Sequence, residues 1–204
     1  MAALISTFPI ALPKRRKLPC SSPRTSLRVA QVTAPDTLFE GPRYFAPFRG
    51  SGLDQFSPQA LAGSAHHLTA LIHALRQGQL HLPDVTHSVF VLTGCGQVPA
   101  SDSLRASLWH AFGVPVYELL LDTENVPIAS ECDAHEGWHI EEGVTFFIQN
   151  DQLWFRWRRR QPACTGLTGL VEEQPCPCGR AGKRIVNVEA DFRDPLRARL
   201  AAIA

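Results

Sequence analysis

Two spacings of apolar residues follow one another along the chain, and each predicts a different kind of element. Between residues 58 and 76 the leucines and an isoleucine recur every three or four positions, which is the spacing of a helix that buries one face. Ser57 and Pro58 precede this stretch as a capping residue and a proline suited to the first helical turn. The pattern therefore predicts a helix that begins at these two residues and ends near Arg76.

A strand, a helix and a second strand are predicted next, at short intervals. The uninterrupted apolar run at residues 89–92 is typical of a buried strand. Ser101 is a capping residue and Gly113 is suited to a helix C-terminus, so a helix is expected between them, with Trp109 among its inward-facing residues. Residues 114–120 form the next apolar strand. This order predicts a right-handed crossover unit on a parallel sheet.

The pattern changes in the second half of the chain. Residues 144–149 and 152–158 are two short stretches separated by Asn150 and Asp151, which favour a tight hairpin turn. Apolar and polar residues alternate in the second stretch, as in a strand with one buried face. A last short strand is expected at 184–188. The sequence thus predicts an α/β fold, in which a partial parallel sheet with crossover helices is joined to a small antiparallel β subdomain.

Composition narrows the class of protein. The 204 residues are 45% hydrophobic and 19% charged, which is ordinary for one globular domain. The net charge of +1 gives no overall field that would attract nucleic acid, so no nucleic-acid partner is expected. No apolar run reaches the length that spans a bilayer, so no membrane association is expected. Six cysteines are too few for a secreted disulfide scaffold, and a cytoplasmic location is expected.

The two ends of the chain differ from the middle. Residues 1–35 contain six lysines and arginines and no acidic residue, and they are interpreted as a disordered basic tail or as the product of a start codon placed too early. Residues 36–190 form the expected domain. Asp194 and Pro195 favour the start of a helix, so residues 191–204 are expected to be a C-terminal helix.

Candidate metal ligands occur as two closely spaced pairs. Cys132 and His135 form a C-x-x-H pair, and Cys176 and Cys178 form a C-x-C pair after a gap of about 40 residues. Three thiolates and one imidazole are a ligand set that zinc favours in closed structural sites, so a zinc site is expected to close the small antiparallel β subdomain. His139 is an alternative fourth ligand, but His135 is preferred because it is closer to Cys132. The competing interpretation is free cysteines in a reducing compartment beside a surface histidine.

Several segments resemble the phenylacetate–CoA ligase group of adenylate-forming enzymes, which includes coenzyme F390 synthetase-like proteins. The resemblance covers about residues 86–190 and depends on segments in the family's order, at residues 91–94, 112–118, 131–142 and 176–180. It implies an enzyme that joins a carboxylate to ATP and passes the acyl group to coenzyme A. It also implies zinc, because members with this Cys/His pattern are similar to zinc-carrying proteins.

The sequence departs from that family where nucleotides would bind. The family's long phosphate-binding loop has only a short counterpart at residues 49–52. Thr123 and Glu124 match the family's nucleotide-binding segment, but Leu121 replaces its glycine. Leu170 stands where a ribose-binding carboxylate is expected, and leucine cannot accept a hydrogen bond. The lysine of the family's C-terminal domain has no counterpart, since no lysine follows residue 188.

These features predict a truncated, degenerate relative of the ligases. The first hypothesis is a non-catalytic, zinc-binding module that binds a protein partner or an acyl or nucleotide-like small molecule. The alternative is one half of a split acyl-CoA ligase, with Thr123 and Glu124 contributing to ATP/AMP and Mg²⁺ binding and another chain supplying the rest. A zinc hydrolase, with Glu136 or His139 as its base, is disfavoured because three thiolates make zinc a poor Lewis acid.

Overall fold

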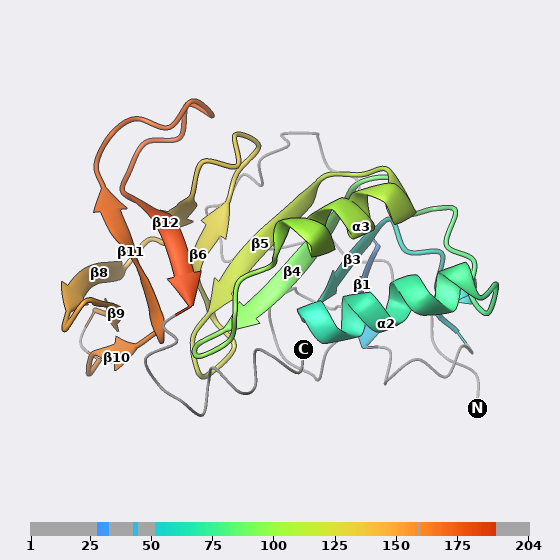
Figure 1. The fold of residues 1–204 in the computed structure, drawn as a ribbon, viewed down its shortest axis with the longest axis horizontal. Helices are drawn as coiled ribbons and strands as arrows, with labels where there is room; N and C mark the ends of the chain where they lie inside the picture. Colours follow the sequence, from blue (N-terminus) through green and yellow to red (C-terminus); the bar gives the residue numbers. More distant parts are fainter. Residues whose placement is uncertain (1–27, 33–42, 45–51, 159, 191–204) are drawn as a thin grey trace. The chain divides into compact units, whose positions relative to one another are not determined.

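The computed structural model describes residues 28–32, 43–44, 52–158 and 160–190, which are drawn in colour in Figure 1. The chain divides into two compact units. The first comprises residues 1–92 and 101–117, and the second comprises residues 93–100 and 118–204. The expected C-terminal helix at 191–204 and most of the expected N-terminal tail lie outside the described residues.

A parallel sheet forms the centre of the first unit. Strand β1 pairs in parallel with β2 on one side and with β3 on the other, and β3 pairs in parallel with β4. The bounds are β1 Val29–Gln31, β2 Arg43–Tyr44, β3 Ala60–Gly63 and β4 Ser88–Gly94. The strand at 88–94 contains the predicted buried run. Strand β1 was not predicted, since it lies within the stretch interpreted as a tail.

The helices of the first unit are α1 (Leu53–Phe56), α2 (Ala65–Arg76) and α3 (Asp102–Phe112), and α2 contacts α3 (Figure 1). Helix α2 ends where predicted but begins later, because Ser64 rather than Ser57 caps it. The preceding residues 60–63 are buried throughout as strand β3, so Leu61 belongs to the sheet. Four consecutive apolar or small residues fit either element, and the parallel pairing with β1 decides for the strand.

Helix α3 begins and ends as the sequence predicts. The Ser101 hydroxyl accepts a hydrogen bond from the Leu104 N–H at 3.2 Å, and Gly113 closes the helix with a left-handed φ of 67°. Leu108 is fully buried, as expected. Trp109 is 52% exposed, so its predicted inward orientation is wrong.

Removing the cap of α3 is expected to destabilise the protein modestly. In Ser101→Ala the Leu104 N–H loses its acceptor, which should lower the free energy of unfolding by about 1 kcal/mol in urea titration. Ser107→Ala, in the interior of the same helix, is the matched control and should be neutral or slightly stabilising, because alanine has the higher helix propensity. Equal losses in the two variants would contradict the capping role.

The second unit is built from antiparallel strands. Strand β6 pairs with β5 and β7, and β12 pairs with β7 and β11. A separate three-stranded sheet has the order β10-β9-β8. The bounds are β5 Val116–Leu121, β6 Pro127–Glu131, β7 Trp138–Ile140, β8 Val144–Gln149, β9 Gln152–Trp157, β10 Ala163–Cys164, β11 Leu167–Glu172 and β12 Arg184–Ala190.

The predicted hairpin is confirmed. Strands β8 and β9 are joined by Asn150 and Asp151, whose φ angles of 52° and 61° are those of a tight hairpin turn. Leu153 and Phe155 of β9 are buried, and they belong to a core that also contains Ile185 of β12. The structure therefore has the predicted mixed α/β architecture, with a parallel sheet and a small antiparallel sheet. None of the described helices is long and apolar enough to cross a membrane.

Candidate metal centre

One side of the centre is formed by the β6–β7 hairpin, at the place where β6 ends. Cys132 follows the last residue of β6 and is 1% exposed. The chain then turns, with the His135 N–H donating to the Cys132 carbonyl at 3.0 Å, and returns as β7. Ser130 of β6 lies opposite His139 of β7. Because side chains alternate along a strand, Ser130, His139 and Cys132 lie on the same face of the hairpin.

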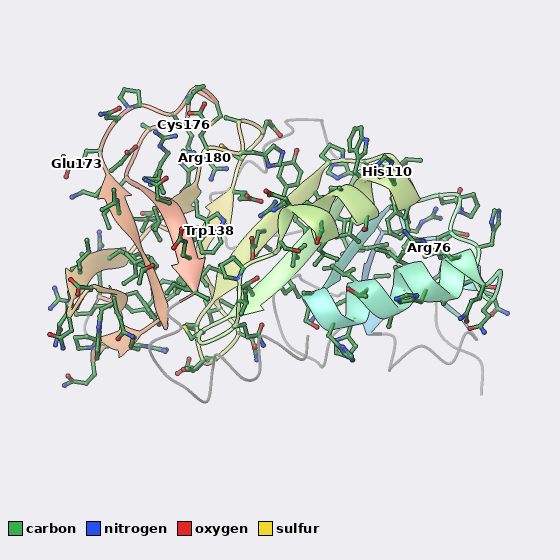
Figure 2. All side chains as sticks on the ribbon, in the orientation of Figure 1. Arg76, His110, Trp138, Glu173, Cys176 and Arg180 are labelled. Atoms are coloured by element: carbon green, nitrogen blue, oxygen red, sulfur yellow. The ribbon has the colours of Figure 1, made fainter. Side chains whose placement is uncertain are left out.

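The other side is the loop between β11 and β12, which carries the second cysteine pair (Figure 2, where Cys176 and Arg180 are labelled). A tight turn closes when the Gly179 N–H donates to the Cys176 carbonyl at 2.9 Å, and Gly179 has a φ of 77°. The Arg180 N–H donates to the Cys178 sulfur at 3.4 Å. Both cysteines are thereby held by the backbone of one short turn.

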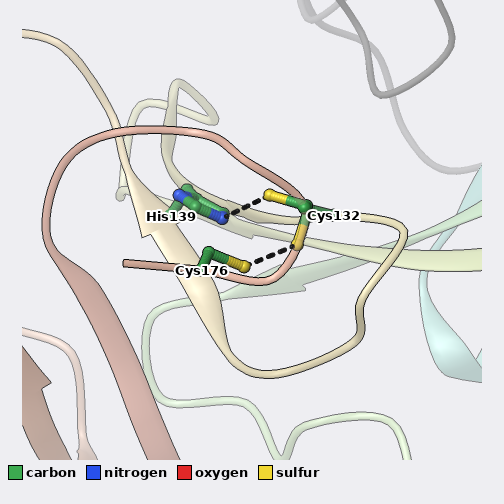
Figure 3. Close-up of side chains that lie close together, drawn as sticks. Cys132, His139 and Cys176 are labelled. Atoms are coloured by element: carbon green, nitrogen blue, oxygen red, sulfur yellow. Dashed lines mark hydrogen bonds between the residues drawn. The ribbon is translucent and has the colours of Figure 1, made fainter. Parts of the chain in front are cut away.

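Pairing of β12 with β7 brings these two segments together. The donor atoms of Cys132, His139, Cys176 and Cys178 all lie within 4.8 Å of one another. The sulfurs of Cys132 and Cys176 are 3.5 Å apart (Figure 3). The Cys178 sulfur is 3.4 Å from His139 Nε2. Zinc–ligand bonds of about 2.0–2.3 Å in a tetrahedron separate donor atoms by roughly 3.6–3.8 Å. The spacing therefore fits a single metal ion of that kind.

The histidine in this group is His139 and not His135, the one preferred from the sequence. The structure brings Cys132, Cys176 and Cys178 together, but with His139 in place of the preferred His135. His135 lies in the turn with a φ of 51°, its side chain is 45% exposed, and its Nδ1 is 4.0 Å from the Glu131 carboxylate. Proximity in sequence favoured His135, whereas strand alternation across the hairpin selects His139. That alternation could have been used only if β6 and β7 had been predicted with their register.

The electrostatics of the group suit a cation. Burial raises the pKa of Cys132 to about 12, and the neighbouring thiols of Cys178 and Cys176 add to the shift. Burial also raises the pKa of Cys176, but hydrogen bonds from Cys178 and Cys132 and the charge of Arg184 lower it overall. Three thiolates this close together repel one another, so the three thiols cannot all lose their protons unless a nearby positive charge compensates. A divalent cation would supply that charge.

The His139 imidazole is in the form that binds metals. Burial, together with the charges of Arg180 and Arg184, lowers its pKa to about 4, so the ring is neutral at pH 7. Its Nε2 faces the Cys178 sulfur, and its Nδ1 is buried with no hydrogen-bond partner among the described residues. The neutral ring can therefore offer the Nε2 lone pair to a metal while Nδ1 carries the proton.

The predicted nucleotide-binding residues lie elsewhere in the second unit. Thr123 and Glu124 occupy the turn between β5 and β6, and both are exposed. Glu124 forms an ion pair with Arg160 at 2.7 Å, in which both side chains are more than half exposed. The Asp122 carboxylate shapes this turn by accepting the N–H groups of Glu124 and Val126, each at 2.8 Å. Neither predicted residue belongs to the four-residue donor group.

A buried carboxylate network in the second unit was not predicted. Glu118 is fully buried and accepts hydrogen bonds from the Thr93 hydroxyl and from the Ala100 N–H, the latter at 2.9 Å. The Glu118 N–H in turn donates to the Glu131 carboxylate at 2.7 Å. No local sequence pattern indicated that Glu118 and Glu131, which lie in separate strands, would be linked in this way. The network holds the segment 93–100 against β5, and its second carboxylate belongs to Glu131, the residue immediately before Cys132.

The fold resembles that of acyl-CoA ligases of the adenylate-forming family. An open conformation of 2-hydroxyisobutyryl-CoA ligase, in complex with 2-HIB-AMP and CoA, matches with a TM-score of 0.61 and 15% identity over 82% of this chain and 45% of that ligase. Coronafacic acid ligase from Pectobacterium brasiliense matches with a TM-score of 0.52 and 14% identity over 81% of this chain and 40% of that ligase. The chain thus spans less than half the length of these ligases, and the likeness establishes the fold.

The sequence alone carries no comparable similarity. It matches no protein-family model and no curated protein.

Proposed function

We propose that this chain is a zinc-stabilised domain with the fold of an adenylate-forming ligase, and that it acts as a binding or accessory module without catalysis of its own. The observation that carries the proposal is the convergence of Cys132, His139, Cys176 and Cys178 from two distant segments. Thiolate and imidazole donors in a compact tetrahedral group suit zinc better than magnesium or calcium, which prefer oxygen. Free thiolate ligands also suit a reducing cytoplasm.

The chemistry of the donor set supports a structural role for the zinc. Three thiolates and one imidazole fill a four-coordinate shell, so no position is left for a water molecule or a substrate. When bound, the ion would fasten the β6–β7 hairpin to the β11–β12 loop. Zinc affinity would then add to the stability of the second unit, because the unfolded chain has no preformed site.

The residues around the expected nucleotide site support the absence of independent catalysis. Leu121, which stands where the phenylacetate–CoA ligase group has a glycine, is 4% exposed at the end of β5. Leu170, at the ribose-binding position of that family, is 51% exposed on β11. Removing one preorganised electrostatic contact typically costs roughly 2.7–4 kcal/mol in the barrier, so several such losses leave little adenylation.

A ligand of the acyl or nucleotide class is proposed from the fold. The 2-hydroxyisobutyryl-CoA ligase structures contain an acyl-adenylate, and two of them also contain CoA. Among ligases with this fold we propose a relationship to the phenylacetate–CoA ligase group, because segments 91–94, 112–118, 131–142 and 176–180 follow that group's order. A protein partner is the other candidate for an accessory module.

Two measurements test this function. Elemental mass spectrometry of the purified full chain should find one zinc per molecule, and Cys178→Ser should reduce that content strongly. Titration calorimetry with ATP and an aryl or acyl carboxylate, combined with a pyrophosphate assay, should detect no turnover. A wild-type protein without bound zinc would contradict the metal assignment, and pyrophosphate release would contradict the absence of catalysis.

The second candidate is one half of a split acyl-CoA ligase, with ATP and Mg²⁺ bound jointly with another chain. The observation that favours it is the match to less than half of each ligase chain. In this case the exposed Thr123 and Glu124 would contribute to the nucleotide site. Co-expression with ligase halves encoded beside this chain should restore adenylation, and Glu124→Gln should reduce it. Activity unchanged by that substitution would exclude the proposed role of Glu124.

The choice between the two histidines gives a separate prediction. His139→Ala should weaken zinc binding severely, because it removes one of the four converging donors. His135→Ala is the matched control, three residues from Cys132 in the same hairpin, and should leave zinc affinity close to that of the wild type. Competition with a chromophoric chelator measures both. The reverse order of affinities would make His135 the ligand.

A further inference from the structure

A buried arginine lies next to the metal centre. Arg184 begins β12 and pairs in register with His139 on β7. Its side chain is only 6% exposed. A buried charge is costly unless it is paired and hydrogen-bonded. This guanidinium therefore needs partners whose hydrogen bonds and charges compensate for its desolvation.

The guanidinium contacts both segments that carry the metal ligands. One terminal nitrogen donates to the Glu136 carbonyl oxygen at 2.8 Å, within the turn between Cys132 and His139. The other donates to the Glu172 carboxylate at 3.2 Å, at the end of β11 where the Cys176 loop begins. The planar fork of arginine thus joins the hairpin to the loop from a single position on β12.

Arg184 also places a positive charge beside the sulfurs. Its guanidinium interacts with the Cys176 side chain through a hydrogen bond and through its charge. A divalent cation bound to three thiolates and a neutral imidazole has a net charge of −1. The Arg184 guanidinium, whose side chain is only 6% exposed, offsets that charge from a buried position, where electrostatic interactions are stronger than in water.

We propose that Arg184 is a positioning residue of the metal centre, which fastens the two ligand-bearing segments together and balances the negative charge of the metal–thiolate group. This inference rests on the proposed zinc site. It concerns a residue that binds no metal itself, and it makes the affinity of the site depend on the guanidinium fork as well as on the four donors.

Arg180 is a weaker candidate for the same role. Its side chain reaches only the Ser130 hydroxyl, at 3.5 Å, among the contacts described for its guanidinium. The hydrogen bond to the Cys178 sulfur comes from the Arg180 backbone, which a substitution would keep. Arg184 is more deeply buried and contacts both segments.

The test measures metal affinity and the cobalt spectrum of the full chain. Co²⁺ in a three-thiolate site gives a sulfur-to-metal charge-transfer band that responds to hydrogen bonds and charges beside the sulfurs. Arg184→Gln is expected to weaken Zn²⁺ and Co²⁺ binding about 10–100-fold and to shift that band, as loss of a partner behind the ligands commonly does. Arg184→Lys should lie between this variant and the wild type, because it keeps the charge but loses the fork.

Arg156→Gln is the matched control, since Arg156 is exposed on β9 and loses the same charge. It should bind both metals as the wild type does. If Arg184→Gln does not fold, the metal affinity and the cobalt band of Arg184→Lys are compared with those of Arg156→Lys instead. Wild-type affinity and an unshifted band in the Arg184 variants would overturn the inference while leaving the zinc site intact, whereas a wild type that binds no metal would overturn the zinc site itself.

Discussion

Cys132→Ser is expected to abolish tight zinc binding and to destabilise the second unit. Cys132 is the most deeply buried of the four donor residues, with 1% of its surface exposed, and its sulfur lies 3.5 Å from that of Cys176. A bound metal present at 1,000 times its dissociation constant stabilises the native state by about 4.1 kcal/mol. Losing that contribution should lower the free energy of unfolding by a similar amount in the presence of zinc.

The same loss should follow when a chelator is added to the wild type. Chemical denaturation with and without excess zinc measures the effect, and Cys132→Ser should be insensitive to zinc. Cys164→Ser is the matched control, because Cys164 is a partly buried cysteine of the same unit that lies outside the donor group. A Cys132→Ser protein that keeps one zinc with wild-type resistance to chelation would refute the proposed site.

Gly137→Ala is expected to give the second large effect, since it blocks the close approach of the ligand hairpin to β12. Gly137 has a φ of +94°, which side chains rarely adopt, and a Cβ built there would lie 2.4 Å from the Ile185 carbonyl oxygen. The backbone conformation costs about 1–3 kcal/mol. Displacing the backbone of β12 adds a further cost of about 1–3 kcal/mol, as overpacking does.

The substitution should also weaken metal binding, because Gly137 lies two residues before His139. Gly179→Ala separates the two costs. Gly179 follows Cys178 and has a φ of +77°, but no atom lies within 4 Å of its added Cβ. In urea titration, Gly179→Ala should therefore lower the free energy of unfolding only by the cost of the backbone conformation. Equal destabilisation of the two variants would mean that the contact with Ile185 does not constrain the site.

The elements that were predicted correctly depend on local signals. Ser101 and Gly113 define α3 because a hydroxyl cap and a left-handed glycine satisfy backbone groups of their own helix. Asn150 and Asp151 define the β8–β9 hairpin because they tolerate positive φ at low cost. The start of α2 was placed wrongly, because apolar residues 60–63 satisfy both helical spacing and a buried strand, and only pairing with β1 distinguishes the two.

The sequence by itself determined the donor chemistry of the candidate site and the two short stretches of chain that supply it, since softness and close spacing belong to the residues Cys132, Cys176 and Cys178. Only the tertiary structure decided the fourth donor and the surrounding charges. His139 replaces His135 because strand alternation and antiparallel register set which side chains share a face. Arg184 reaches the centre for a related reason: β12 pairs with β7, a contact between residues about 45 positions apart that no local pattern encodes.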